Sequence, residues 1–437
     1  MEIWAFVMFF ALMAALMFGY PVAFTLGSVA LIFGGIFLGL DFFHLLPLRI
    51  WGVMTNFTLL AVPLFVFMGV VLEKTGLSED LLETMGLLLG RVRGGLALSV
   101  VVVGALMAAT TGVVGATVVT MGIIALPAML KHGYSSSLAT GTIAASGTLG
   151  QIIPPSVVLI ILGDVIGVPV GRLFIAAVVP GLLLVLLFLI AIAVFCWRWP
   201  GAAPALRTTD SPGLVTRMLK SLLPPLALVV AVLGSIFFGI ASPTESAAVG
   251  ALGALLLAAL HRRLNLSALQ DAMRQTTRLT SMVFLILIGA TAFGLVFRGM
   301  GGDHLVNDIM TQLPGGTWGF VLVSMVLIFV LGFFLDFLEI TFIVVPILGP
   351  IAAVLGIDLL WFTILIAVNL QTSFLTPPFG FSLFYLKAVS PPEVKIQHIY
   401  RGILPFVTIQ LVCILLLAAF PGITVWLPNL MDKLQGF

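Results

Sequence analysis

Two of the Pro-Pro pairs in this sequence lie inside long apolar stretches, and polar side chains precede each of these two. The stretch GTLGQIIPPS contains Pro154 and Pro155, and the stretch NLQTSFLTPPFG contains Pro377 and Pro378. A proline inside a helix removes a hydrogen bond and clashes with the preceding turn, so each pair predicts a broken helix. Oxygens freed at such a break can bind a hard cation, and the N-terminus of the next half-helix attracts an anion. A simple kink is the alternative to such a site.

Two other polar stretches divide apolar segments and offer different ligands. The stretch ATTGVVGAT (109–117) offers only neutral oxygens, whereas LDFLEIT (335–341) carries Asp336 and Glu339. A carboxylate at membrane depth is costly and indicates a functional site by default. The alternative is that the second stretch reaches the membrane surface, where both acids are hydrated.

The composition is that of a helical membrane protein. Of 437 residues, 61% are hydrophobic and 8% are charged, and the mean hydropathy is +1.27. A soluble domain has roughly 25% charged residues. Apolar runs of about 18 residues or more recur along the chain, and each can cross a lipid bilayer as a helix. A net charge of +2 without a basic–aromatic patch gives no indication of nucleic-acid binding.

The cysteines and the N-terminus fit this class. Cys196 and Cys413 both fall in apolar runs, which argues against a structural disulfide. The first run carries Glu2 but no Lys or Arg, so we expect a retained span rather than a signal peptide.

The positions of the prolines indicate an internal duplication. Four pairs are separated by 223 residues: Pro127 and Pro350, Pro154 and Pro377, Pro155 and Pro378, Pro169 and Pro392. Chance predicts about 0.6 such pairs at this proline content, which is near the average usage. Coincidence is the alternative, but internal repeats are common in secondary transporters.

Each half of the chain contains five predicted spans and one predicted re-entrant hairpin. The spans are roughly 3–18, 22–40, 56–72, 138–163 and 173–197, then 221–240, 244–260, 280–298, 359–388 and 402–428. The hairpins are 94–130 and 317–355, and spans 138–163 and 359–388 are the broken helices. Because five is odd, the halves 1–199 and 221–437 are predicted to be inverted repeats joined by the linker 200–220. Hairpins that crossed fully as two helices would preserve this parity, so re-entrance rests on the polar tips.

The distribution of Lys and Arg supports the inverted arrangement. If both termini are periplasmic, all but four of the 19 basic residues lie inside, the exceptions being Arg49, Arg172, Arg298 and Lys433. Cytoplasmic segments carry the excess of Lys and Arg in membrane proteins, so the linker is predicted to be cytoplasmic. The amphipathic segments 73–93 and 261–278 are expected to lie along the cytoplasmic interface.

Catalytic motifs are missing from the sequence, which predicts that the protein is not an enzyme. There is no His-Glu-x-x-His and no P-loop. Met300 replaces the first glycine of a Gly-x-Gly-Asp motif ending at Asp303, and Ala144 replaces the glycine of a Gly-x-Ser-Gly motif around Ser146.

The same stretches resemble the large membrane subunit of TRAP transporters, the DctM type. The resemblance is carried by TGVVGATVVTMGIIALPAMLKHGYSSSLATGTIAASGTLGQIIPPS (111–156), NFTLLAVPLFVFMG (56–69) and ILIAVNLQTSFLTPPFGFSLFYLKAV (364–389), and it covers essentially the whole chain. It implies a tripartite uptake system of the bacterial inner membrane. The partners would be a periplasmic substrate-binding protein and a small four-helix membrane subunit of the DctQ type. The family also implies sodium coupling, an organic-anion substrate and an elevator motion of the hairpin-bearing domain.

The chain departs from the commoner family pattern at two places. Thr111, Gly112 and Val113 replace a Ser-Gly-Ser at the first hairpin tip, and Ser373 replaces a glycine before the second Pro-Pro pair. These features resemble the branch often named for mannitol or chloroaromatic compounds, a name that is a weak guide to substrate.

With this resemblance, the polar stretches predict two sodium sites and one substrate site. The first sodium site is expected where 110–115 approach 146–150, and the second where 332–336 approach 369–373. The expected sodium ligands are Thr110, Thr111, Gly112, Gly115, Ser146, Gly147 and Gly150, then Gly332, Asp336, Asn369, Thr372 and Ser373. The expected substrate residues are Thr148, Gln151, Pro154, Pro155, Gln371, Thr376, Pro377 and Pro378.

The predicted spans place no Lys or Arg at membrane depth, so no buried cation would neutralise a carboxylate substrate. Bound Na⁺ and half-helix N-termini would have to supply the positive potential. The alternatives are a stand-alone carboxylate carrier of the same fold, coupled to sodium or protons, and a channel-like or structural membrane subunit.

Overall fold

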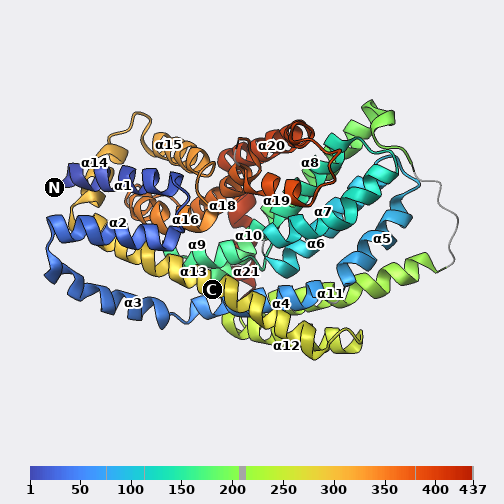
Figure 1. Ribbon diagram of the computed structural model, residues 1–437, viewed down its shortest axis with the longest axis horizontal. Helices are drawn as coiled ribbons and strands as arrows, with labels where there is room; N and C mark the ends of the chain where they lie inside the picture. Colours follow the sequence, from blue (N-terminus) through green and yellow to red (C-terminus); the bar gives the residue numbers. More distant parts are fainter. Residues whose placement is uncertain (75, 113, 206–212, 379, 436–437) are drawn as a thin grey trace.

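The computed structural model describes residues 1–74, 76–112, 114–205, 213–378 and 380–435, and these residues form helices without a strand. The expected first hairpin tip includes Val113, and the expected linker includes residues 206–212; both lie outside the described residues. By length and composition, six of the described helices can each cross a membrane, and two bent helix pairs can do so as well. The predicted all-helical, multi-span membrane fold is therefore confirmed (Figure 1).

The first part of the chain begins with α1 to α5. These helices are α1 (Glu2–Met17), α2 (Val22–Phe37), α3 (Leu46–Met54), α4 (Ala61–Lys74) and α5 (Leu77–Leu89). The next five helices are α6 (Gly95–Thr111), α7 (Val114–Lys131), α8 (Ser136–Thr148), α9 (Val157–Ile166) and α10 (Val170–Arg198). Four short 3₁₀ turns, η1 (Leu40–Leu45), η2 (Thr58–Leu60), η3 (Leu149–Gln151) and η4 (Pro200–Ala202), accompany them.

The second part contains eleven further described helices. The first of these are α11 (Leu214–Phe237), α12 (Pro243–Leu260), α13 (Leu266–Gly299), α14 (Gly302–Thr311), α15 (Gly316–Leu331) and α16 (Phe337–Ile343). The others are α17 (Val345–Val354), α18 (Leu359–Leu375), α19 (Phe381–Val389), α20 (Ile396–Ala419) and α21 (Gly422–Gln435).

Three expected elements differ from the observed helices. The segment 261–278 is not a separate interfacial helix, because α13 runs unbroken from Leu266 to Gly299. The Asn265 side chain caps its N-terminus by accepting a hydrogen bond from the Ala268 amide, and no Gly or Pro follows until Gly289. The predicted span 402–428 is two helices, since Pro421 ends α20. The predicted span 56–72 is α4, which meets α3 at a bend of 54°.

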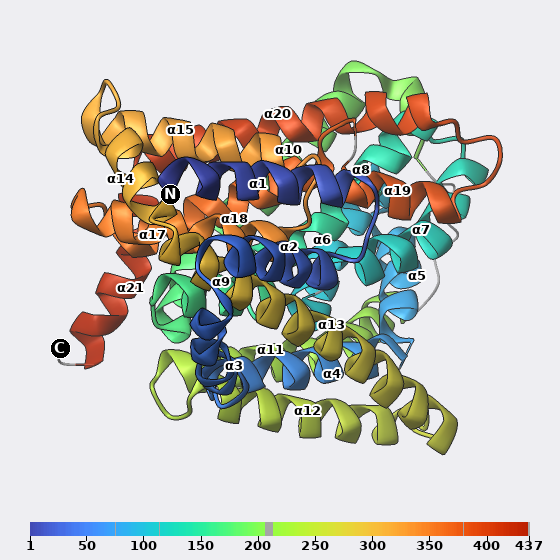
Figure 2. The same cartoon turned by 60° about the vertical axis from the view of Figure 1, so that its left-hand side comes forward.

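The helices form two sides of the molecule. In Figures 1 and 2, α3, α4, α11 and α12 lie on one side, and α8, α15, α18 and α20 lie on the other. On the first side α4 packs against α12, while α2 packs against α13. On the second side α8 packs against α6, α7 and α20, and α18 packs against α15. The Pro154–Pro155 pair lies between α8 and α9, and the Pro377–Pro378 pair lies between α18 and α19.

The contact between α8 and α20 depends on two glycines. A Cβ atom on Gly141 would overlap the backbone carbonyl of Gly402, and a Cβ atom on Gly402 would overlap the carbonyl of Ser137. Small residues allow the backbones of membrane helices to approach closely, which strengthens their dispersion contacts. This pair therefore fixes the position of the first broken helix against α20.

We expect Gly141→Ala to destabilise the protein by about 1–3 kcal/mol, because the methyl group has no space and the helices must separate. Gly234→Ala is the matched control, since Gly234 lies within α11 with no atom near the site of a new Cβ. The control gains helix propensity and should keep or raise its thermal midpoint. Thermal unfolding in detergent measures both variants, and equal midpoints would contradict the close approach.

Candidate functional site

The first broken helix exposes its polar groups within the protein interior. Helix α8 ends at Thr148, η3 follows, and α9 begins at Val157, so the peptide groups around Pro154 and Pro155 are outside any helix. Ser156 Oγ donates to the carbonyl of Gln151 over 2.8 Å. Pro154 and Pro155 are buried, and the Pro154–Pro155 bond is cis.

The hydroxyl groups before this break donate to their own helix. Ser146 Oγ donates to the Thr142 carbonyl over 2.6 Å, and Thr148 Oγ1 donates to the Ala145 carbonyl over 2.8 Å. Both side chains are fully buried. A hydroxyl that donates in this way keeps oxygen lone pairs free to accept a hydrogen bond or contact a cation.

The tip of the first hairpin lies against this break. Gly112 ends α6 in a left-handed conformation (φ +59°), and a Cβ atom there would lie 3.2 Å from the carbonyl oxygen of Pro155. Thr110 and Thr111 both donate to the Met107 carbonyl over 2.9 Å. Thr111 Oγ1 also lies 2.9 Å from Thr117 Oγ1. The tip is therefore lined with neutral oxygens beside an unwound backbone.

Glycines of the first broken helix pack against both arms of the hairpin. Gly147 lies against Val118 of α7. A Cβ atom on Gly150 would lie 3.7 Å from Cα of Ala108 in α6. The residues that flank the tip, Ala108 and Val118, therefore lie against Gly150 and Gly147, whereas Gly112 lies nearest to Pro155. The sodium site predicted between 110–115 and 146–150 stays a prediction. Gly115 is different, because a Cβ atom there would lie 3.3 Å from the ring of Tyr385, on α19 of the second broken helix.

The second broken helix has a similar set of hydroxyls before its Pro-Pro pair. Its side chains that donate to their own helix are Thr372 (to Val368, 2.8 Å), Ser373 (to Leu370, 2.9 Å) and Thr376 (to Thr372, 2.7 Å). Asn369 Nδ2 instead donates to the Met325 carbonyl on α15 over 2.7 Å, and Gly332 lies directly against the Ser373 side chain. The first arm of the second hairpin therefore packs on α18, which brings 332 next to 373.

The second break is more open than the first. Pro377 is half-buried and Pro378 is exposed, and the Pro377–Pro378 bond is cis. The Tyr400 hydroxyl donates to the Pro378 carbonyl over 2.9 Å, and Ser382 Oγ donates to the Phe374 carbonyl over 3.0 Å. Side chains of α19 and α20 thus satisfy carbonyls at the break.

Two acids form the start of α16 at the second hairpin. Asp336 Oδ1 accepts from the Phe337 amide over 2.7 Å, and Glu339 Oε2 accepts from the Asp336 amide over 3.2 Å. Asp336 is half-buried and Glu339 is 7% exposed, so Glu339 is not a hydrated surface acid. The chain turns at 332–336, slightly before the expected tip at 335–341. Neither carboxylate forms an ion pair with a described Lys, Arg or His.

One buried hydrogen bond connects the two breaks. Gln371 Nε2 donates to Thr148 Oγ1 over 3.3 Å, although the two residues are 223 positions apart. Gln371 Oε1 and both amide atoms of Gln151 are buried without a partner among the described residues. An unsatisfied buried polar atom costs about 1–3 kcal/mol. A polar ligand would therefore not have to displace a protein partner from these amide atoms.

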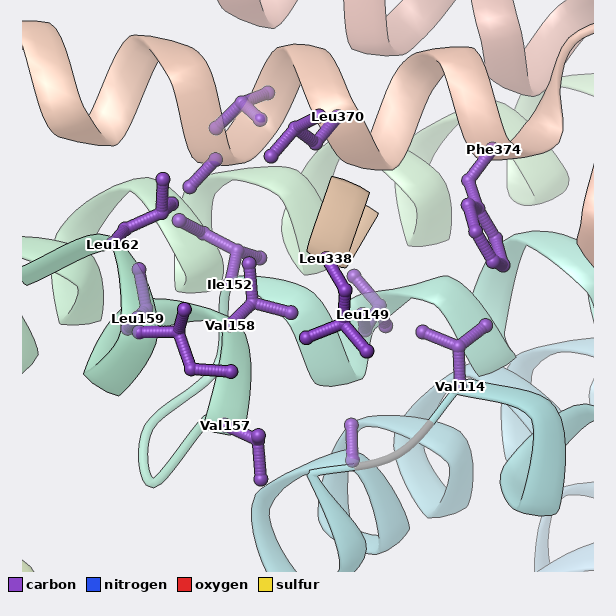
Figure 3. Packing of buried hydrophobic residues seen from close by; sticks show 14 of the residues in the cluster. Val114, Leu149, Ile152, Val157, Val158, Leu159, Leu162, Leu338, Leu370 and Phe374 are labelled. Atoms are coloured by element: carbon purple, nitrogen blue, oxygen red, sulfur yellow. The ribbon is translucent and has the colours of Figure 1, made fainter. Parts of the chain in front are cut away.

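Apolar side chains surround these polar groups. Figure 3 shows side chains from the first hairpin (Val114), the first break (Leu149), the second hairpin (Leu338) and the second broken helix (Leu370 and Phe374) in one cluster. Polar interactions inside such a low-dielectric region are stronger than in water.

Two residues of this region were not anticipated from the sequence. Tyr385 contacts the first hairpin at Gly115, which no local pattern indicates. Gln410 is fully buried in α20 with both amide atoms unpartnered among the described residues. The sequence could have indicated Gln410, because an amide side chain within the apolar run TIQLVCILLLAA is unusual at membrane depth.

Comparison with known proteins identifies the family. Residues 6–423 match the family model described as the DctM component of the tripartite ATP-independent periplasmic transporter. The large permease protein DctM of the C4-dicarboxylate TRAP transporter of Pseudomonas aeruginosa is 32% identical over 88% of this chain and 89% of its own length. The large permease protein SiaM of the sialic acid TRAP transporter of Vibrio cholerae is 30% identical over 96% of this chain and 97% of its own length.

More distant relatives extend this result. The large permease protein TeaC of the ectoine TRAP transporter of Halomonas elongata is 28% identical over 97% of this chain and 99% of its own length. The crystal structure of the YdaH transporter of Alcanivorax borkumensis shares the fold, with a TM-score of 0.64 and 16% identity over 94% of this chain and 98% of that chain. The relatives are permease components rather than enzymes, as the missing catalytic motifs predicted. The chain belongs to the DctM family, the large permease subunits of TRAP transporters.

Proposed function

We propose that this permease subunit imports an organic anion across the bacterial inner membrane by sodium-coupled alternating access. A small membrane subunit and a periplasmic binding protein would act as its partners. The observation that carries the proposal is the hydrogen bond between Thr148 and Gln371, which joins two helix breaks beside unpartnered amides. Relatives of the same family are named for C4-dicarboxylates, sialic acid and ectoine.

The charge distribution supports sodium coupling. The side chains before the two breaks are neutral, and the nearest hairpin acids are Asp336 and Glu339. An organic anion placed between these elements is repelled by the carboxylates unless a cation is bound as well. Hydroxyl and carbonyl oxygens at the hairpin tips, such as Thr111 Oγ1 and the Pro155 carbonyl, are suitable ligands for a hard monovalent cation.

We further propose that the hairpins and broken helices move together as an elevator against α2, α4, α12 and α13. The contact between α4 and the first hairpin tip supports this motion. A Cβ atom on Gly69 of α4 would lie 2.5 Å from Cα of Thr111 and 2.7 Å from the carbonyl oxygen of Thr110. A glycine here leaves a smooth helix surface along which the tip can slide.

Among the described residues, few side-chain hydrogen bonds join the proposed moving body to this scaffold. Asn56 Nδ2 donates to Asp164 Oδ1 over 2.7 Å, and Thr120 Oγ1 donates to Glu73 Oε1 over 2.8 Å. Two such bonds are compatible with repeated separation, because each has a modest net free energy of about 0.5–3 kcal/mol. The inverted orientation of the halves and the periplasmic position of both termini belong to the same proposal.

Reconstituted alone in proteoliposomes, the chain should show almost no uptake, because the proposed cycle needs both partners. Addition of the small subunit, the loaded binding protein and an inward sodium gradient should restore accumulation of the substrate. Uptake is measured with radiolabelled substrate, with and without the gradient. Full uptake by the isolated chain would instead support a stand-alone carrier.

Replacement of Pro154 and Pro155 by alanine should abolish uptake. Inside a helix, proline is less favourable than alanine by up to about 3 kcal/mol, so the substitutions allow α8 and α9 to join. The carbonyls at the break would then accept hydrogen bonds within the continuous helix. Pro180→Ala is the control, because Pro180 lies within the unbroken helix α10. Both variants should assemble normally in membranes, and uptake by the double variant equal to that of the control would show that the break is only a kink.

Asp336→Asn should raise the sodium concentration that gives half-maximal uptake about tenfold, which corresponds to 1.4 kcal/mol of lost sodium binding. The amide keeps the oxygen that accepts from the Phe337 amide but removes the charge. Asp308→Asn on the exposed surface of α14 is the control. An unchanged sodium curve for Asp336→Asn would exclude the carboxylate from the sodium site.

A further inference from the structure

A cavity of about 980 Å³ lies apart from both breaks and both hairpin tips. Helices α3, α13 and α14 form one wall, and α9, α16 and α17 form the other. Figure 2 shows α3, α9, α14 and α17 at the same end of the molecule. The lining contains none of the residues expected to bind sodium or substrate. The cavity is therefore a separate space between the proposed scaffold and the proposed moving body.

Arginine side chains on the scaffold wall have no acidic partner. Arg49 on α3 and Arg298 at the end of α13 both line the cavity, and neither forms an ion pair with a described residue. Arg298 Nε donates only to the backbone carbonyl of Gly294, 3.3 Å away. His304 of α14 lies on the same wall and is exposed. The guanidinium groups thus keep most of their donors free for an anion, which they bind with two parallel hydrogen bonds.

Two acids also face the cavity, and they differ in position. Asp164, at the end of α9, belongs to the opposite wall, and its carboxylate accepts from the Asn56 amide. Asp303 lies next to His304, and its Oδ1 atom is buried without a partner among the described residues. Arg49 and Arg298 therefore face the space without a neutralising contact, whereas Asp164 already has a neutral partner.

The opposite wall is largely apolar. Helices α16 and α17 contribute Phe342, Ile343, Pro346 and Ile347 to it. A free inorganic anion would leave this wall in contact with water. A carboxylate that carries an apolar body can contact both walls. Its body would bury apolar surface, which is favourable by about 25 cal/mol per Å², and its carboxylate would pair with a guanidinium group.

We propose that this cavity is a capture site for an organic carboxylate with an apolar body, held by Arg49 and Arg298 before it reaches the breaks. The inference rests on the proposed transport function, since the captured acid is the solute awaiting transport. The two arginines would also supply positive charge, which the region around the breaks and the hairpin acids lacks. Arg49 and Arg298 are at the end that the charge distribution predicts to be periplasmic, where a binding protein would release its ligand.

The charge of the cavity can be measured by thiol labelling of the purified full chain in detergent, without transport. Thr291 lines the cavity, and its hydroxyl only donates to the Leu287 carbonyl, so Thr291→Cys is a mild change. Thr311→Cys, on the exposed end of α14 outside the lining, is the matched control. The parent chain gives the background, because Cys196 and Cys413 are buried.

The ratio of labelling rates for an anionic and a cationic methanethiosulfonate reagent should be higher at position 291 than at 311. Combined with Arg49→Gln and Arg298→Gln, the ratio at 291 should fall about tenfold, whereas the ratio at 311 should not change. The double variant Arg49→Lys and Arg298→Lys keeps both positive charges and should keep most of the ratio of labelling rates. This variant tests the role of charge even if the glutamine variant fails to fold. Equal ratios at 291 and 311, or a ratio that the glutamine variant leaves unchanged, would overturn the proposal.

Ligand binding is tested with hexanoate and its neutral analogue hexanamide. Hexanoate should slow labelling at 291 by a factor of several, and hexanamide should not. Equal effects of the two compounds, or none, would exclude a carboxylate site. Because labelling needs neither sodium nor partners, a loss of uptake with intact labelling would count against the proposed transport cycle and not against the capture site.

Discussion

The structure depends on how two helix breaks are satisfied inside a membrane. A lipid environment offers no water to backbone groups, so every carbonyl and amide freed by a Pro-Pro pair needs a protein or ligand partner. At the first break, Ser156 donates to the Gln151 carbonyl and the left-handed turn at Gly112 brings a hairpin tip against Pro155. At the second, Tyr400 donates to the Pro378 carbonyl. The freed carbonyls of Gln151 and Pro378 are therefore satisfied by side chains outside the hairpins, and the first hairpin tip packs beside Pro155.

The contact between the breaks has a consequence for symmetry. Thr148 and Gln371 are separated by 223 residues, which is the separation of the paired prolines. If the halves are repeats, these are equivalent positions, and equivalent positions can touch only close to the axis that relates the two halves. The unpartnered amides of Gln151 and Gln371 lie in this same central region. A single ligand bound there would contact both halves, which is the arrangement that alternating access requires.

Charge is divided between two places. The centre is neutral apart from Asp336 and Glu339, whereas Arg49 and Arg298 line the cavity at one end together with Asp164 and Asp303. The cavity thus offers guanidinium groups to an anion, and the centre would offer positive charge only if cations occupied the hairpin tips. In the proposed cycle, bound sodium would make the centre favourable for an anion that the arginines have captured.

The sequence by itself determined the features that depend on local chemistry. Apolar run length predicted the membrane helices, and proline chemistry predicted the interruptions between Thr148 and Val157 and between Leu375 and Phe381. The sequence was also sufficient to identify the family, because the motifs around Pro154–Pro155 and Pro377–Pro378 are specific to it. Local pattern failed at α13, where a charged amphipathic segment and an apolar span are one helix, since nothing in the sequence required a break.

Only the tertiary structure decided which distant side chains meet. The sequence placed Gly115 at the first hairpin tip but did not show that it contacts Tyr385, and Asp336 and Glu339 could have been hydrated or buried. Arg49 and Arg298 were simply outside the membrane in the span model, and their shared cavity arises from the packing of α3 and α13 against α17 and its neighbours. Such contacts join segments far apart in the chain, and the period of a single helix carries no information about its partners.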